Sequence, residues 1–335
     1  MSFSYQTSTA IIRQLSDYAF ILAELSARQI YFRSSSLQRF RTFAFQWSTK
    51  PSQQADVDQL RDALARAGAT TGALVMAHTS VGGVTLHAAG ETGSGKQGPV
   101  ATATSILREL MSAVGDEGTL VLPTHPNYPD DPGYHSSVDK SRLVLNYDPE
   151  RTPSSVGLVS ELFRRFPGSL RSHHPLQTIS CRGRRAEQLL LGNLNADKPL
   201  PHGVHSGYYR FCVARGLVLS IGVPLIKCCT LIHVGEDVRD AEWPVKNFFR
   251  ERPFRVRLGR EERDWIVRER RPLFVRSYCD GQLHRDLLRE GILKEGYAGT
   301  IRFDYANAYS IFEYLMQRNA GNTYPYFLPS LAQVG

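Results

Sequence analysis

The sequence lacks a long apolar run, and it contains few cysteines. No apolar stretch reaches the roughly eighteen residues that a membrane-spanning helix needs. The first residues do not show the basic segment and apolar core that are typical of a secretory signal. Of 335 residues only five are cysteines, and none of them are paired in CxxC spacing. The sequence therefore predicts neither a disulfide framework nor a cysteine zinc site, and we expect a cytoplasmic protein with reduced thiols and no membrane span.

The charge is unbalanced towards the positive side. The net charge is +8, and basic residues are concentrated at 164–165, 182–185 and 250–271. A basic surface attracts anionic partners. However, the chain shows no RNA-binding motif, no zinc finger and no basic helix with interleaved aromatic residues, so we do not expect nucleic acid as a partner. Small anionic ligands such as a coenzyme or a nucleotide-linked sugar remain compatible with this charge.

Residues 1–54 are predicted to be a helical N-terminal extension. Their apolar positions indicate one or two amphipathic helices, and turn-forming residues follow at 34–36 and 49–52. Such a segment can mediate docking or a homodimer, or it can simply pack on the main domain. Both interpretations stay open from the pattern alone.

Residues 55–330 have the alternating pattern of an α/β domain. Buried strands are predicted at 73–77, 120–122 and 217–221, and helices are predicted from near Asp56, from Pro99 and from 152–154. A long glycine-rich loop is predicted over 82–98. Within it, residues 90–96 read GETGSGK and match the start of a phosphate-binding loop, but Gln97 replaces the serine or threonine that would bind magnesium. Its glycines and Lys96 can still help to hold an anionic coenzyme.

Three short segments carry residues suited to chemistry. Residues 78–82, HTSVG, follow the first predicted strand, and ligands of open α/β sheets bind beyond the carboxyl ends of strands. His173 and His174 are candidates for a general base, because histidine titrates near neutral pH. In the segment 230–237, His233 and Glu236 become neighbours if the segment is helical. As an alternative, His173, His174, His233 and Glu236 could be metal ligands of a hydrolase, although their spacing matches no metal motif.

Taken in order, these segments resemble the aminoglycoside 3-N-acetyltransferase family. The most specific part is DPxxTPSxxGxxxExFRR at 148–165, followed by RSxHP at 171–175. Further matching stretches cover about residues 57–240 in the right order, and they are HTS at 78–80, GTLVLPT at 118–124, Gly203, Ser206, LVLSIG at 217–222, and Thr230, His233 and Glu236.

The resemblance implies an α/β fold with a central mixed sheet flanked by helices. It implies acetyl-CoA as the acyl donor, direct transfer to an amino group of a sugar-like acceptor, and no metal. By motif, His174 matches the catalytic histidine and Glu236 an acidic residue of the active site, which we expect to orient His174. The coenzyme-binding positions implied are His78, Thr79, Ser80, Val81, Gly82, Lys96, Gly98, Thr152 and Ser154. The acceptor-binding positions implied are Thr124, Tyr128 and His233.

The sequence also departs from the family pattern. The usual glycine pair before the helix at Pro99 is reduced to Gly98, behind an enlarged loop, and Cys228-Cys229 precedes Thr230. The aminoglycoside substrates of the family are polycations, whereas this chain is basic. An amine on an anionic or neutral molecule, such as a nucleotide-activated amino sugar, therefore fits better. A non-catalytic protein that binds coenzyme or nucleotide on the same scaffold is the remaining alternative.

Overall fold

The protein is described by a computed structural model that covers residues 15–17, 19–27, 30, 34, 52–89, 98–131, 142–194, 197–243, 245–271, 274 and 278–318. A seven-stranded sheet forms its centre, with strands in the spatial order β11 (Leu293–Ala298), β12 (Ile301–Asn307), β8 (Leu217–Ile221), β2 (Leu74–Thr79), β4 (Thr119–Pro123), β7 (Ile179–Gly183) and β6 (Leu170–Arg171). The three central strands β8, β2 and β4 are parallel, and every other pair is antiparallel. The predicted central mixed sheet is confirmed.

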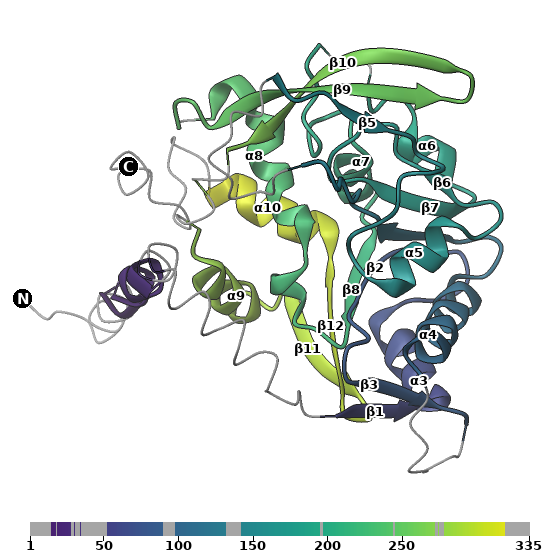
Figure 1. Ribbon diagram of the computed structural model, residues 1–335. Helices are drawn as coiled ribbons and strands as arrows, with labels where there is room; N and C mark the ends of the chain where they lie inside the picture. Colours follow the sequence, from purple (N-terminus) through teal and green to yellow (C-terminus); the bar gives the residue numbers. More distant parts are fainter. Residues whose placement is uncertain are drawn as a thin grey trace, which may run out of the picture.

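Helices cover both faces of this sheet (Figure 1). On one face lie α3 (Val57–Ala67), α4 (Pro99–Val114) and α5 (Leu158–Arg164). On the other lie α6 (Ala186–Leu190), α7 (Gly207–Val213), α8 (Val234–Arg239), α9 (Asp280–Arg289) and α10 (Ala308–Arg318). Successive side chains of a strand point to opposite faces, so Val75 and Ala77 of β2 join the first core and Leu74 and Met76 the second. Both faces are buried, which explains the continuous apolar runs of the central strands.

The predicted helix starts agree with the structure at two of three places. Asp56 accepts a hydrogen bond from the amide of Gln59 and caps α3, which ends at Gly68 in the left-handed conformation. Pro99 occupies the first turn of α4, where its missing N–H is not needed. The helix predicted from 152–154 instead begins at Leu158. Gly157 precedes it with φ of 110°, which is outside the helical region.

The prediction of a continuous loop over 82–98 is wrong in its first part. Val84–His87 form β3, which pairs in parallel with β1 (Gln53–Asp56), because Val84 and Leu86 alternate into the core beside α3 and α4. Residues 90–97, which include the phosphate-loop match and Lys96, lie outside the described residues. The boundary predicted at residue 54 falls inside β1, so the end of the N-terminal segment belongs to the main body.

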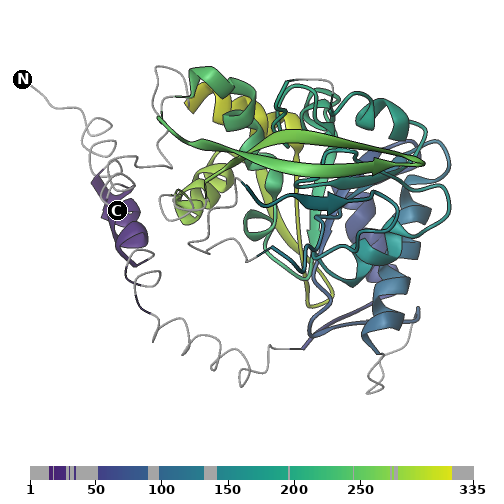
Figure 2. The ribbon, with the colours of Figure 1, turned by 45° about the horizontal axis from the view of Figure 1, so that its top comes forward.

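A second sheet joins β5 (Leu145–Tyr147) to the long hairpin of β9 (Phe249–Leu258) and β10 (Glu261–Arg270). In Figure 2 this hairpin lies across the front of the molecule, above the main sheet. A small core of its own forms beneath it around Tyr147, Phe254 and Val267. The last residue of β10, Arg270, contacts the predicted active-site segment 230–237 at Glu236.

Helical residues 19–27 of the N-terminal extension lie beside α9 in Figures 1 and 2, and their side chains contact it. Leu25 is fully buried in the second core, and the Glu24 carboxylate accepts hydrogen bonds of 3.1 and 3.2 Å from the amide of Gly281. Residues 15–17, 19–27 and 30 of the extension are helical, whereas residues 34 and 52 are not and residues 53–54 belong to β1. The helical part packs on the main domain. Across the described residues, the longest apolar helical stretch is too short to cross a membrane.

Candidate active site

The central strands bring the predicted functional segments to one edge of the sheet. β2 pairs with β4 on one side and with β8 on the other, so the chain changes direction across the sheet at β2. Ligands of open α/β sheets bind at such a switch point, beyond the carboxyl ends of the strands. His78 lies near the end of β2, Thr124 directly follows β4, and residues 225–233 follow β8 in two short 3₁₀ turns.

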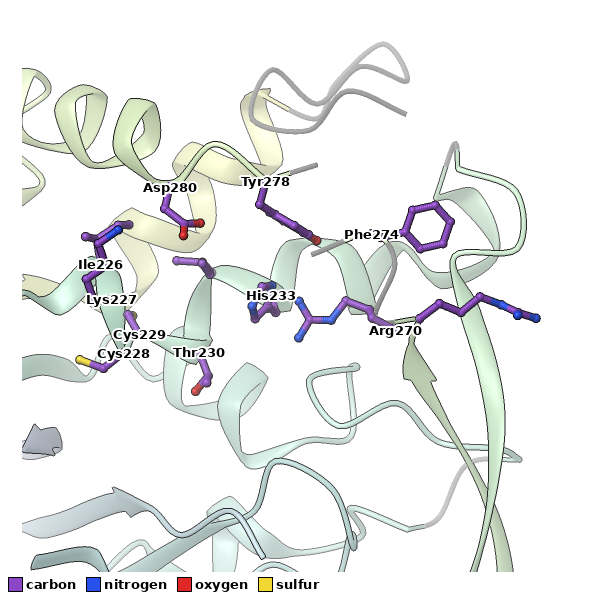
Figure 3. Close-up of a pocket in the computed structure, with 12 residues that line it drawn as sticks. Ile226, Lys227, Cys228, Cys229, Thr230, His233, Arg270, Phe274, Tyr278 and Asp280 are labelled. Atoms are coloured by element: carbon purple, nitrogen blue, oxygen red, sulfur yellow. The ribbon is translucent and has the colours of Figure 1, made fainter. Parts of the chain in front are cut away.

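His233 and Glu236 form the best-defined pair at this edge. His233 ends the second 3₁₀ turn and Glu236 lies in α8, so the continuous helical path makes them neighbours, as the spacing predicts. The distance from His233 Nδ1 to Glu236 Oε1 is 3.3 Å, and Arg270 Nη1 donates to Glu236 Oε2 over 3.1 Å. Figure 3 shows the Arg270 guanidinium directed at this histidine. The three residues form a short chain of hydrogen bonds that leads from the second sheet to His233.

Burial and charge in this hydrogen-bonded series determine the protonation states of Glu236 and His233. Burial raises the pKa of Glu236 to about 7, although the Arg270 guanidinium pulls it down. Burial, and then the Arg270 charge, hold the pKa of His233 well below its usual value. His233 is therefore neutral at physiological pH. With Nδ1–H donating to the carboxylate, its Nε2 carries the lone pair, and among the described residues the one side-chain hydrogen bond of His233 is that of Nδ1.

A pocket of about 210 Å³ opens beside His233. The His233 side chain is 20% exposed there, whereas that of Glu236 is 1% exposed. In Figure 3, Tyr278 and Asp280 lie on one side of the His233 ring and Thr230 lies on the other. The described residues that line the pocket are Ile226, Lys227, Cys228, Cys229, Thr230, Ile232, His233, Arg270, Arg271, Phe274, Tyr278 and Asp280. A neutral imidazole with a free nitrogen at a pocket can take a proton from a bound ligand.

His174 has a different environment, and the predicted pairing with Glu236 is wrong. Its Nε2 lies 3.2 Å from the Pro199 carbonyl, and its Nδ1 lies 3.1 Å from the Leu176 amide. No hydrogen bond or ion pair joins His174 to Glu236, both of which are described. Burial lowers the pKa of His174 to about 4. Both ring nitrogens are thus occupied by the backbone, which leaves no lone pair for a substrate.

The whole RSxHP segment connects loops. The buried Arg171 guanidinium donates to the carbonyls of Thr124 and Thr152 over 2.5 Å each, and thereby joins the end of β4 to the 148–154 turn. Ser172 Oγ accepts from Asn193 Nδ2 over 2.8 Å. His173 lies apart from these contacts, beside Arg257 and Gly259 in another surface hollow. The motif that most strongly indicates the family is therefore built into the scaffold around the site.

The sequence reasoning missed a second buried pair close to His233. His202 donates through its backbone amide and its Nδ1 to Asp237 Oδ2, over 3.0 and 3.1 Å. Its ring centroid lies 5.8 Å from that of His233 and 4.7 Å from that of Tyr208. Burial opposes ionisation of Asp237, but the hydrogen bonds from His202 outweigh it and lower the pKa of the carboxyl. Asp237 directly follows Glu236, and each of these two adjacent carboxylates in α8 contacts one histidine. The consecutive acidic residues were therefore the sequence signal that could have indicated a second pair.

Arg270 was also missed as a site residue. It belongs to the basic run 250–271, which the sequence presents only as a positively charged region. Cross-strand pairs such as Arg255–Asp264 and Arg257–Glu262 account for other arginines of that run at the surface. Sequence spacing does not distinguish Arg270, which contacts α8, from these surface arginines, because the end of β10 lies beside α8 only in the folded chain.

The predicted coenzyme-binding positions are divided in the structure. His78 is buried, and Thr79, the last residue of β2, is half-buried. Ser80 and Val81 are half-buried in the connection that continues to the exposed Gly82. The amides of Val81 and Gly82 donate to no other described residue. Gly98 caps the N-terminus of α4 without a side-chain hydrogen bond, and Lys96 lies outside the described residues.

The remaining predicted positions have partners within the protein. Thr152 Oγ1 accepts from the Asp148 amide over 2.9 Å, and Ser154 Oγ is 3.4 Å from the Val156 amide. Thr124 is fully buried, with its hydroxyl 3.1 Å from that of Ser180, and Tyr128 donates to the Pro175 carbonyl over 2.5 Å. Of the three predicted acceptor-binding residues, only His233 lines the pocket described above.

The four residues of the metal alternative do not converge. Glu236 contacts His233, whereas His174 is held at Pro199 and His173 lies in a separate hollow. Within the described ranges, no group of three or more histidine, cysteine, aspartate or glutamate side chains is arranged to hold a metal ion.

Comparison with known proteins identifies the family. The model of the aminoglycoside 3-N-acetyltransferase family matches residues 76–319. Aminoglycoside N(3)-acetyltransferase IX of Micromonospora chalcea is 27% identical over 261 residues, which cover 72% of this chain and 85% of that protein. Aminoglycoside N(3)-acetyltransferase VII of Streptomyces paromomycinus is 32% identical over 155 residues, or 43% of this chain, and the match spans only half of that relative's length.

Solved structures show the same fold. The structure entitled AAC-IIIb binary with CoASH superposes with a TM-score of 0.60 at 22% identity, covering 79% of this chain and 97% of the other. Aminoglycoside acetyltransferase AAC(3)-Xa superposes with a TM-score of 0.59 at 23% identity, covering 79% and 93%. These structures confirm the predicted fold. The family model and the curated relatives support the predicted class of enzyme, an N-acetyltransferase. The chain belongs to the aminoglycoside 3-N-acetyltransferase family.

Proposed function

We propose that this protein transfers the acetyl group of acetyl-CoA directly to an amino group of a small, sugar-like acceptor, with His233 as the general base. The observation that carries the proposal is the hydrogen-bonded series Arg270–Glu236–His233, which ends at a pocket with a free imidazole nitrogen. The family assignment supports the reaction class, and one solved relative is named as a complex with CoASH.

The proposed roles follow from the contacts. Glu236 accepts from Nδ1–H of His233, which fixes the tautomer and stabilises the imidazolium that forms in the reaction. As the acceptor nitrogen bonds to the thioester carbonyl carbon, His233 Nε2 takes its proton. Collapse of the adduct breaks the carbon–sulfur bond, and the imidazolium returns the proton to the departing sulfur. The proton that His233 gains in the first step is returned in the second, so His233 is neutral again at the end of the turnover.

The acyl donor needs hydrogen-bond donors for the oxyanion and for its phosphates. The exposed turn after β2 offers the amides of Val81 and Gly82, which have no acceptor among the described residues, and it lies at the same sheet edge as His233. Free amides at a strand end favour developing or permanent negative charge. We therefore place the thioester end of the donor between this turn and His233, and its phosphates towards Gly98.

The experiment compares two histidines in one assay. Release of coenzyme A thiol from acetyl-CoA is measured for the full chain, His233→Ala and His174→Ala with a panel of amino sugars, sugar nucleotides and aminoglycosides. Loss of a general base costs about a hundredfold to ten-thousandfold in rate, and we expect this loss in His233→Ala. His174→Ala should keep a turnover number within about tenfold of the parent at a temperature where it remains folded.

Two outcomes would contradict the proposal. The first is a His233→Ala variant with near-normal turnover. The second is a larger loss of turnover in His174→Ala, with coenzyme binding and folding preserved in both variants. Absence of thiol release with every amine, combined with tight acetyl-CoA binding, would instead support a non-catalytic coenzyme-binding protein.

A further inference from the structure

A second buried carboxylate lies beside the His233–Glu236 pair. Asp237 directly follows Glu236 in α8 and is 2% exposed. Its Oδ2 accepts from the backbone amide of His202 over 3.0 Å and from the ring Nδ1 of the same residue over 3.1 Å. The His202 ring also lies 5.8 Å from the ring of His233, measured between centroids. His202 therefore contacts both Asp237 and the proposed base.

The buried charges around His233 are not balanced while its ring is neutral. Glu236 and Asp237 are two carboxylates, and the guanidinium of Arg270 faces both of them. Burial opposes ionisation of Asp237, but the hydrogen bonds and charge of His202, and then the Arg270 charge, hold its pKa below the ordinary value. With both carboxyls ionised, these three side chains carry one excess negative charge, which a proton on His233 neutralises.

We propose, on the basis of the proposed function, that Asp237 is a second counter-charge for the His233 imidazolium and that His202 holds it in place. Both are then positioning residues of the reaction. With Glu236 alone, the Arg270 charge would already be compensated, and the proton that His233 accepts would add an unpaired positive charge to a buried site. An unpaired buried charge is costly, so the second carboxylate lowers the free energy of the imidazolium state.

The other groups around His233 do not supply this charge equally well. The titratable and charged side chains that face it or line its pocket are Glu236 and Asp237 of α8, Arg270 of β10, Arg271 after it, His202 before α7, His125 after β4, Lys227 after β8, and Tyr278 and Asp280 at the start of α9. Burial lowers the pKa of His202, and that of His125 to about 3, so both are neutral. Asp280 is half-buried at the open pocket, and solvent screens its charge more than that of Asp237.

The competing explanation is that His202 and Asp237 only anchor residues 197–206 to α8. An anchor depends on hydrogen bonds, whereas a counter-charge depends on the negative charge. Asp237→Asn separates the two, because the amide keeps the shape of the side chain and an acceptor oxygen for the donors of His202 but carries no charge.

The experiment titrates His233 and measures turnover on the same proteins. Nitrogen NMR of the histidine rings, assigned with His233→Gln, gives the apparent pKa of the coupled His233–Glu236 pair. After burial and the Arg270 charge, the negative charge of Asp237 acts on both members and raises the pKa of each, so its loss lowers both.

In Asp237→Asn we therefore expect this apparent pKa to fall by about one unit. The acid limb of kcat/KM, measured by thiol release, should move to lower pH by the same amount. The turnover number at alkaline pH should fall about tenfold, which is the rate equivalent of one pKa unit.

Asp304→Asn is the matched control. Asp304 is also fully buried, and its carboxylate also accepts from a backbone amide, that of Leu225, and from a side chain, that of Arg302. This variant should have a lower melting temperature, but the apparent pKa of the His233–Glu236 pair and the acid limb should not move.

Two substitutions of His202 form a second test. An asparagine amide can replace the ring Nδ1 as a donor to Asp237, whereas a leucine of similar size cannot. His202→Asn should keep a turnover number near that of the parent. In His202→Leu burial raises the pKa of Asp237, so the turnover number should fall about as far as in Asp237→Asn, and combining the two substitutions should add little.

Three results would overturn this inference. One is an apparent pKa that stays in place, or rises, in folded Asp237→Asn. Another is an equal shift in Asp304→Asn. The third is an equal loss of turnover in His202→Asn and His202→Leu, which would remove the role of His202 in holding Asp237. Failure of the proposed function itself appears elsewhere, as near-normal turnover of His233→Ala, and the NMR titration does not depend on turnover.

Discussion

His174 and His233 are both poorly exposed histidines in family-like motifs, but their ring nitrogens meet different partners. Two backbone groups, at Leu176 and Pro199, occupy both nitrogens of His174. At His233 a carboxylate engages Nδ1, and Nε2 remains without a partner among the described residues. A histidine held by two backbone groups connects loops, whereas one oriented by a carboxylate at a pocket can exchange a proton. The difference shows that a motif can be specific for a family without carrying its reacting group.

The largest effect that tests this comparison is expected from Glu236→Gln. The amide can no longer stabilise an imidazolium, and it permits the wrong tautomer, so we expect the turnover number to fall by about a hundredfold or more. The measurement is steady-state thiol release beside the melting temperature. Glu109→Gln is the matched control, since Glu109 is also buried and paired with an arginine, Arg61, but lies in α4. If the turnover number falls equally in Glu236→Gln and Glu109→Gln, Glu236 has no special role in the reaction.

The second prediction concerns stability and the other histidine. His174→Ala leaves the Pro199 carbonyl and the Leu176 amide without partners in a buried place, which should cost about 2–4 kcal/mol of unfolding free energy. Chemical denaturation measures this loss. His87→Ala, at a buried histidine with a single side-chain contact to Gln54, should cost less.

The pH dependence of the His174 contribution has a definite sign. The native pKa of His174 is about 4 against an ordinary 6.5. Its contribution to stability is therefore complete above pH 6.5 and is lost as pH falls towards 4. The difference in unfolding free energy between the parent and His174→Ala should thus shrink below pH 6.5. A difference that stays constant over that range would show that His174 is not a buried neutral group.

Much of this fold could be predicted from the sequence because local signals and burial agree. The alternation of strands and helices, the Asp56 and Gly68 ends of α3 and the Pro99 start of α4 all follow from short-range rules. β3 was missed because a four-residue strand inside a glycine-rich stretch carries little signal of its own. It is defined by pairing with β1, which is about thirty residues earlier in the chain.

The site could be predicted only where its contacts are local. The pairing of His233 with Glu236 follows from helical spacing. The contact of Arg270 with Glu236 and that of His202 with Asp237 each span more than thirty residues, and no periodicity indicates them. The error at His174 has the same origin. Its partner at Pro199 is a backbone carbonyl 25 residues away, which residue identity cannot reveal.

A third, smaller effect tests whether Arg270 sets the protonation of Glu236 and His233. Arg270 lowers the pKa of both Glu236 and His233, so Arg270→Met should raise both. The reaction needs Glu236 ionised and His233 neutral, and the acid limb of kcat/KM against pH should therefore move to higher pH, by about one unit. Arg250→Met is the control, because Arg250 pairs with Glu269 on the same hairpin. An acid limb that stays in place, or moves to lower pH, would show that Arg270 does not set the charge of the pair.

The smallest expected effect asks whether the described N-terminal helix, which lies outside the family match, supports the site. The family model begins at residue 76, yet Glu24 accepts from the amide of Gly281 at the start of α9, and Phe20 lies under the Arg285 guanidinium, 3.5 Å from ring centroid to Cζ. α9 begins with Asp280, which lines the pocket.

Loss of one charged acceptor at a helix N-terminus costs about 1 kcal/mol. Glu24→Ala should therefore lower the melting temperature slightly and raise the KM of the amine a few-fold, because the first turn of α9 is less well held, while kcat remains near that of the parent. Glu24→Gln, which keeps an acceptor oxygen, should lie between the two. A lower melting temperature with an unchanged KM would limit the N-terminal helix to stability. A fall in kcat instead of a rise in KM would mean that α9 affects the His233–Glu236 pair itself. The regions around His174 and His233 would then be less independent than their contacts indicate.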